Sequence, residues 1–140
     1  MEKLDLSALD TKKGAEAGFE VQLSHPQTGA LLPIWITVLG ADSDTYQATA
    51  KAQQRKRADK LMRGRRFQFA TPDEQEEDDL DLLSTVTTGW RAEADLDGKP
   101  WPAFSAAVAR ALYKRFPWIK EQLFTATADR ANFLPRSASG

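Results

Sequence analysis

The chain has no cysteine and only one histidine, His25, among its 140 residues. Disulfides and thiolate metal sites are therefore excluded, and no cluster of His and Cys ligands can form. His25 lies in a turn beside Pro26, where a surface role is expected, because catalysis needs partners that the sequence does not supply. The glycines are isolated and form no phosphate-binding loop. We expect no enzymatic activity, no metal site and no cofactor.

Long apolar runs and a strong net charge are also missing. No apolar run approaches the length of a transmembrane helix. The opening sequence MEKLDLSALD is acidic and lacks the apolar core of a secretory signal. A formal net charge of -1 argues against a general binder of nucleic acid or membranes. The length predicts one domain. We expect the protein to be soluble and to stay inside the cell, with no membrane partner.

The first part of the chain predicts a loose arm and then a β-hairpin. Residues 1–17 are polar and interrupted by alanine and glycine, so a flexible arm is expected. From Phe19 onwards apolar residues alternate with polar ones, and a second alternating run follows the turn at 24–29. This pattern predicts a hairpin over residues 19–39. Pro33 favours an edge position for its second strand.

Four helices are expected after the hairpin, and local start and stop signals set their limits. Asp44 begins a capping box, and Thr71 stands before a proline at another helix start. Ser105 is a predicted N-cap, while Pro117 ends that helix and begins the next. The expected helices cover approximately residues 44–62, 72–88, 105–116 and 117–130.

These elements together predict an α+β fold. It consists of an N-terminal β-hairpin followed by a mainly α-helical region with a C-terminal helix pair. We expect a single domain over residues 18–134 and a flexible tail at 135–140.

Charge is segregated in the middle of the chain. The basic residues come first, at Lys51, Arg55, Lys56, Arg57, Lys60, Arg63, Arg65 and Arg66. The acidic residues follow at once, at Asp73, Glu74, Glu76, Glu77, Asp78, Asp79 and Asp81. Three interpretations are open: an antiparallel helix pair that neutralises itself, a charged protein–protein surface, or a surface that follows phosphates. We favour them in that order, and the candidate partner-binding cations are Arg55, Arg57 and Arg63.

Large aromatic residues gather in the C-terminal third. The candidate partner-binding aromatics are Trp90, Trp101, Phe104, Trp118 and Phe133. Core packing is the commoner role for such residues, but a chain this short can hardly bury all of them. Trp101 stands between two prolines in a turn and is the strongest candidate for an exposed anchor. Trp118 is expected to hold the C-terminal helix pair together, so that its loss would mainly unfold the domain.

A series of short motifs in this third resembles a known family. The motifs are Gly89-Trp90, Asp97-Gly98-Lys99-Pro100, Phe104-Ser105, Arg110-Ala111-Leu112-Tyr113, Arg115-Phe116-Pro117-Trp118-Ile119 and Arg130-Ala131-Asn132-Phe133-Leu134. In this order they resemble the tail assembly chaperones of long-tailed bacteriophages and prophages. The remainder of the chain is similar to that family only in its layout of a hairpin and a charged helix.

The resemblance implies a non-enzymatic protein of the host cytoplasm. Members of this family coat the tape measure protein, recruit tail tube protein and leave before the virion matures. They tend to form homo-oligomers, and many occur in two lengths through a ribosomal frameshift. The family supplies no catalytic residues.

Two alternatives stay open at this level. The first is a structural head-tail connector or minor tail protein of a phage particle, which would be found in purified virions. The second is a small nucleic-acid-binding regulator that uses the basic helix between Lys51 and Arg66.

Overall fold

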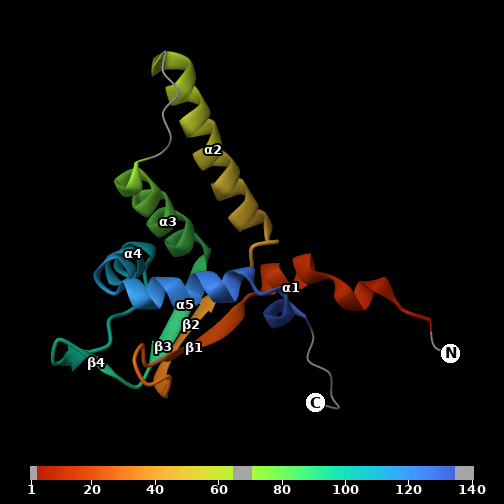
Figure 1. Ribbon diagram of the computed structural model, residues 1–140. Helices are drawn as coiled ribbons and strands as arrows, with labels where there is room; N and C mark the ends of the chain where they lie inside the picture. Colours follow the sequence, from red (N-terminus) through yellow and green to blue (C-terminus); the bar gives the residue numbers. More distant parts are fainter. Residues whose placement is uncertain (1–2, 65–70, 135–140) are drawn as a thin grey trace.

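The computed structural model describes residues 3–64 and 71–134, with the side chains of residues 63 and 64 outside that description. Its centre is a three-stranded antiparallel sheet, with α3 and the C-terminal helices over one face (Figure 1). The strands are β1 (Phe19–Ser24), β2 (Leu31–Val38) and β3 (Thr87–Ala92), in the spatial order β1-β2-β3. The fold is α+β, and the predicted N-terminal hairpin is present as β1 and β2.

The third strand corrects two predictions. Residues 87 and 88 were expected to end a helix, but α3 (Pro72–Val86) stops before them and β3 begins at Thr87. The β-branched threonines at 87 and 88 favour extended backbone at this point, and the glycine at 89 disfavours a longer helix. Because β3 pairs with β2, Pro33 lies in the central strand and not at an edge. The pairing of β1 with β2 shifts register between Gln22 and Ser24, in the region of Pro33.

The helices begin and end at residues with clear capping roles. The main ones are α2 (Asp44–Gly64), α3, α4 (Ala106–Arg115) and α5 (Pro117–Ala128). Ser43, and not Asp44, caps α2, because its hydroxyl accepts from the amide of Tyr46. The hydroxyls of Thr71 and Ser105 accept from the third residue of α3 and α4 in the same way. The C-terminal helices are two, as the sequence predicted.

The core lies between the inner sheet face and α3, α4 and α5. Alternate residues of the strands face inward, and the most deeply buried side chains include Leu23, Ile36, Leu80, Leu83, Tyr113 and Leu123. Tyr113 is buried among them, and its hydroxyl shares a 2.8 Å hydrogen bond with the hydroxyl of Thr87. Burial raises the pKa of Tyr113 to about 12, because the phenolate would be poorly solvated.

A small clasp joins helix α1 (Thr11–Ala17) to the 3-10 turn η2 (Arg130–Phe133), near the two ends of the described chain. It corrects the expected arm for residues 11–17, whereas residues 1 and 2 lie outside the described residues. The 3-10 turn η1 (Leu6–Leu9) precedes α1, and α1 packs against η2. Ala15 is buried, and its carbonyl accepts from the amide of Gly40. Gly14 and Gly40 allow the close approach that this packing needs.

An ion pair fastens the clasp to the loop before α2. Arg130 donates to both carboxylate oxygens of Asp42, at 2.8 and 2.9 Å. The Arg130 guanidinium and, after it, the Thr11 hydroxyl lower the pKa of Asp42 from its usual 3.8 to about 2. Because the pKa is lower in the folded state, the pair contributes stability above about pH 4 and loses it as the pH falls towards 2.

Asp42→Asn should therefore lower the free energy of unfolding near neutral pH by a small margin, since Arg130 is largely exposed to water. Urea titrations of both proteins across the acid range measure this difference in the free energy of unfolding. It should shrink as the pH falls from about 4 to about 2. A margin that stays constant down to pH 2 would show that Asp42 acts in another way.

Candidate partner-binding surfaces

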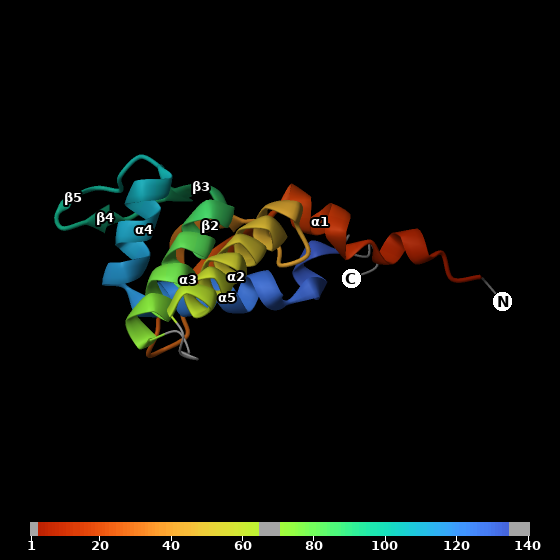
Figure 2. The same cartoon turned by 90° about the horizontal axis from the view of Figure 1, so that it is seen from above.

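Helix α2 projects from the body of the molecule. Its C-terminal end is the part of the helix furthest from the sheet (Figure 1), and the view from above in Figure 2 shows α2 running beside α3. From Asp44 to Met62, where side-chain exposure is described, the helix has no buried residue. Tyr46 and Leu61 are half-buried at its two ends. A helix of 21 residues thus contributes very little to the core.

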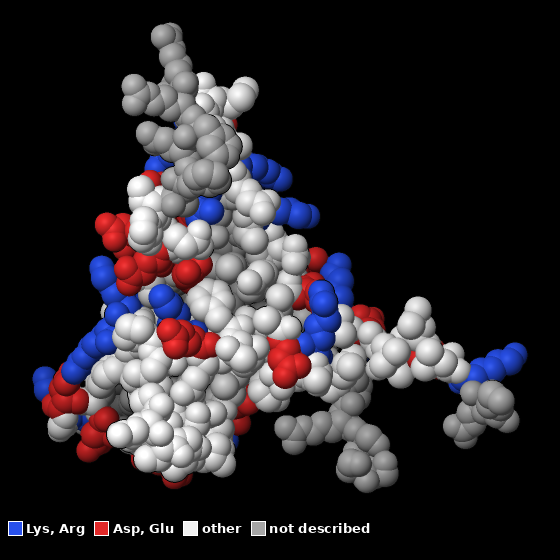
Figure 3. Space-filling model, viewed as in Figure 1, with Lys and Arg blue, Asp and Glu red and all other residues white. Residues whose placement is uncertain are grey.

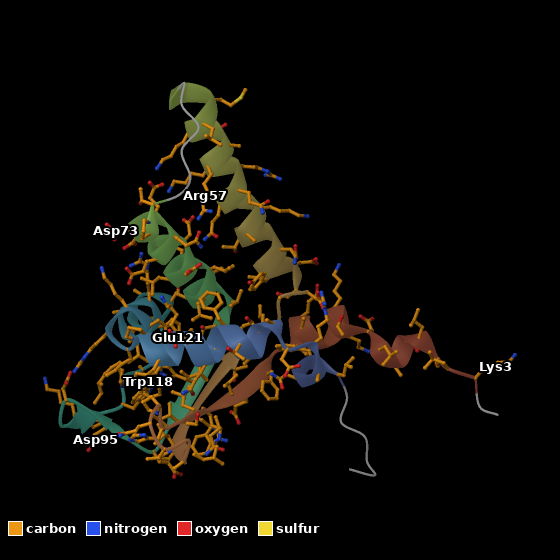
Figure 4. The ribbon with its side chains drawn as sticks, viewed as in Figure 1. Lys3, Arg57, Asp73, Asp95, Trp118 and Glu121 are labelled. Atoms are coloured by element: carbon orange, nitrogen blue, oxygen red, sulfur yellow. The ribbon has the colours of Figure 1, made fainter. Side chains whose placement is uncertain are left out.

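The inner face of α2 is neutralised by α3. Arg57 donates to Asp78 and, at 3.0 Å, to the side chain of Gln75, while Lys60 pairs with Glu74 at 3.3 Å. The two helices enclose a furrow of about 270 Å³ lined by Lys56, Arg57, Lys60, Asp73, Glu74, Glu77 and Asp78. Figure 4 labels Arg57 on α2 and Asp73 near the start of α3. The geometry agrees with the self-neutralising helix pair, and Arg57 is engaged within it.

The acidic residues of α3 are shared with α4. Arg110 donates to Asp81 at 2.8 Å and also to Glu77, which lies 3.9 Å from Lys114. Figure 3 shows acidic side chains over α3 with basic ones beside them. These bonds raise the pKa of Arg110, with the Asp81 carboxylate as the largest cause. The acidic segment is therefore a bridge between two basic helices.

The outer face of α2 keeps exposed cations and short side chains. Lys51 and Arg55 are exposed and form no ion pair with another described residue. Ala48 and Ala52 lie beside them, and Met62 is 86% exposed. These positions share one side of the helix because they are three, four or seven residues apart. Basic side chains point outward from α2 in Figure 3. We call Ala48, Lys51, Ala52, Arg55 and Met62 the outer face of α2.

The structure thus separates the three candidate cations. Arg55 belongs to this outer face, whereas Arg57 points into the furrow and bonds to Asp78. The side chain of Arg63, like residues 65 and 66 of the predicted basic run, lies outside the described residues. The tail predicted at 135–140 lies outside them as well.

Three of the candidate aromatics form a cluster of their own. The rings of Trp101 and Phe104 stand edge-on to Trp90, with centroids 5.9 and 5.2 Å away. The indole of Trp90 donates to the carbonyl of Pro102 at 3.0 Å. Trp101 is half-buried in this cluster rather than fully exposed, and its role as a partner anchor stays a prediction. The cluster packs the connection between β3 and α4 onto the sheet.

Phe133 is a core residue and not a contact surface. It lies in η2, is only 4% exposed, and stands edge-on to Phe19 with ring centroids 6.0 Å apart. Its burial follows from the clasp, because α1 covers η2. The sequence could not show this, since it predicted no packed structure before Phe19.

Trp118 lies on a groove between α5 and the free edge of β1. It is half-buried, and the groove of about 480 Å³ is lined by Val21, Gln22, Ser24, Pro26, Trp118, Glu121, Gln122 and Thr125. Figure 4 shows Trp118 and Glu121 on the same side of α5. Trp118 was expected to hold the helix pair together, yet it also forms part of an open surface. We call this feature the Trp118 groove.

No family model, curated protein or solved structure matches the chain. None of the helices in the described part of the chain has the length and apolar character needed to cross a membrane. Within residues 3–64 and 71–134, no three acidic, histidine or cysteine side chains are grouped to hold a metal ion.

Two features of the surface escaped the sequence analysis. On the outer sheet face, Arg91 stacks 4.0 Å above the ring of Trp35 and donates to both oxygens of Glu20. This stack covers Trp35, and the bond from Arg91 lowers the pKa of Glu20. The other feature is the wall of the Trp118 groove, formed by Glu121, Gln122 and neighbours on α5. They lie three, four and seven residues after Trp118, so the sequence could have placed them on the same side of a helix as Trp118. It could not show that β1 lies opposite them.

Proposed function

We propose that this chain is a non-enzymatic assembly factor that acts as a phage tail assembly chaperone in the host cytoplasm. It binds the tape measure protein, helps recruit the tail tube protein, and self-associates. The observation that carries the proposal is α2, whose described side chains include none that is buried. Isolated helices gain little stability on their own, so a projecting helix is best explained by a partner that covers it.

The outer face of α2 suits another helix. Ala48 and Ala52 have short side chains, which let a second backbone approach closely. Lys51 and Arg55 can pair with acidic residues at the rim of such a contact, and Met62 adds a flexible apolar contact. This combination is typical of helix-in-groove and helix-on-helix recognition. The resemblance of the C-terminal motifs supplies the identity of the partner.

The test is co-purification of the tagged protein with the tape measure protein of the same genome, at moderate and high salt, with duplex DNA as competitor. Lys51→Glu combined with Arg55→Glu should weaken capture about tenfold, since it reverses two rim charges. The free energy of unfolding should change by less than about 0.5 kcal/mol, because both side chains are exposed.

The matched control reverses two exposed lysines elsewhere, Lys13→Glu with Lys99→Glu, and should leave capture unchanged. Equal losses in both double variants would show a general charge effect and count against the outer face of α2. If the wild-type protein does not capture the tape measure protein, the proposed chaperone function is contradicted.

A small nucleic-acid-binding regulator is the second candidate, and the exposed Lys51 and Arg55 are what favours it. Phosphate binding through these cations predicts an affinity for duplex DNA that falls steeply with salt. Retention of DNA at moderate salt, its loss at high salt and no capture of the tape measure protein would select this candidate.

A further inference from the structure

Strand β1 has a free edge, and one side chain already fills the place of a neighbouring strand there. The backbone amide of Ser24 donates to Gln122 Oε1 at 3.0 Å, and Gln122 Nε2 donates to the Ser24 carbonyl at 2.8 Å. A neighbouring β-strand would make the same pair of bonds. Within the described residues, β1 pairs only with β2, on its opposite side.

The rest of this edge is available for pairing. In a strand the outward backbone groups recur at every second residue, so Gln22 and Glu20 face the same way as Ser24. The register agrees, because the extra residues at the shift between Gln22 and Ser24 lie in β2. β1 therefore presents a regular row of donors and acceptors at the mouth of the Trp118 groove.

Helix α5 forms the opposite wall of the groove, facing Val21, Gln22 and Ser24 of β1. Trp118, Glu121, Gln122 and Thr125 share one side of the helix, since they are spaced by three, four and seven residues. Trp118 stands at the hairpin end of the groove, which Pro26 also lines. Figure 3 shows a surface without charged side chains around the place where Figure 4 labels Trp118. A strand edge beside a helix is a recurring geometry for binding extended peptides.

The charge of Glu121 and its distance from Trp118 indicate which kind of peptide the groove can bind. Glu121 is the only charged residue among those lining the groove, and it forms no ion pair with another described residue. It lies one helical turn from Trp118, about 4.5 Å along the axis. Side chains on one face of a strand recur about every 6.8 Å, so two groove-facing residues of a peptide can meet both.

We infer that the Trp118 groove binds an extended segment of a partner protein, which adds to β1 as a fourth strand. The segment places an apolar side chain on Trp118 and, two residues away, a lysine or arginine beside Glu121. Gln122 keeps Ser24 hydrogen-bonded while the groove is empty. This site is separate from the outer face of α2 and does not depend on the tape measure protein being the partner.

The test selects peptides of about ten residues from a random phage-displayed library on the full chain, then maps their binding by NMR. Selected peptides should share an apolar residue with Lys or Arg two positions away from it. They should shift the amides of Glu20 and Gln22 and the indole signal of Trp118, and slow hydrogen exchange at both amides. No selected peptides, or shifts confined to α2, would overturn the inference.

Two variants make the test specific. When the selection is repeated on Glu121→Lys, the peptides should carry Asp or Glu in place of Lys or Arg. If they still carry Lys or Arg, the pairing of Glu121 with a basic residue is wrong. Gln22→Pro removes one outward amide, which an edge strand tolerates, and should weaken binding of a selected peptide about tenfold. If Gln22→Pro unfolds the chain, the peptide preference of Glu121→Lys still tests the inference. Peptide binding without capture of the tape measure protein would contradict only the proposed function. Capture of the tape measure protein without peptide binding would contradict only this inference.

Discussion

Phe133→Ala is expected to lower the free energy of unfolding by roughly 3–5 kcal/mol, which corresponds to a fall in Tm on the order of 10 °C. The side chain is 4% exposed, and its ring packs edge-on to Phe19. A methyl group on Gly40 would lie 3.0 Å from the same ring, which shows how tightly the site is filled. Removal of the ring loses the contacts with Phe19, Gly40 and α1 and leaves a space among them.

Urea unfolding followed by tryptophan fluorescence measures the loss. Leu31→Ala is the control, since Leu31 is 69% exposed and its removal should cost less than about 1 kcal/mol. Two variants with similarly small losses would mean that Phe133 is not packed as described. In that case its original assignment as a partner contact would become the better explanation.

Gly14→Ala is expected to destabilise the chain by roughly 2 kcal/mol, although helix propensity alone predicts a gain. Gly14 lies in α1, where alanine would normally be favoured over glycine by up to about 1 kcal/mol. However, a methyl group there would overlap the backbone carbonyl of Phe133. Backbone cannot rotate away as a flexible side chain can, so α1 must separate from η2.

Hydrogen exchange at the amides of α1 and thermal unfolding together measure this effect. The exchange should speed up in α1 before the rest of the molecule is affected. Gly89→Ala is the matched control, because a methyl group on Gly89 meets no atom within 4 Å. A Gly14→Ala variant that is as stable as the wild-type protein would contradict the clasp.

Patterns within a few residues of each other predicted much of this fold. The alternation around Phe19 and the capping residues Thr71 and Ser105 are local, and the corresponding elements are present. Strand β3 was missed because Val86 and Trp90 continue the helical spacing of the residues before them. Pairing with β2, through Ile36 opposite Trp90, decides the outcome there and is not visible locally.

The candidate surfaces were harder to predict because exposure depends on contacts between distant parts of the chain. Trp101 and Trp118 are equally large and apolar, and only tertiary packing assigns the first to an aromatic cluster and the second to a groove. Arg55 and Arg57 differ by two positions, yet one faces outward and the other bonds to Asp78. The period of the helix could have separated them, had the position of α3 been known.

The weak attachment of α2 also affects how unfolding is observed. All four tryptophans, at positions 35, 90, 101 and 118, lie outside α2, whereas its 21 residues supply a large share of the helical backbone. Fluorescence therefore reports the sheet and the C-terminal helices, while far-ultraviolet circular dichroism also reports α2. A helix with so few buried contacts can melt as a separate cooperative unit. The two signals then follow different transitions, and a partner that covers α2 would bring them together.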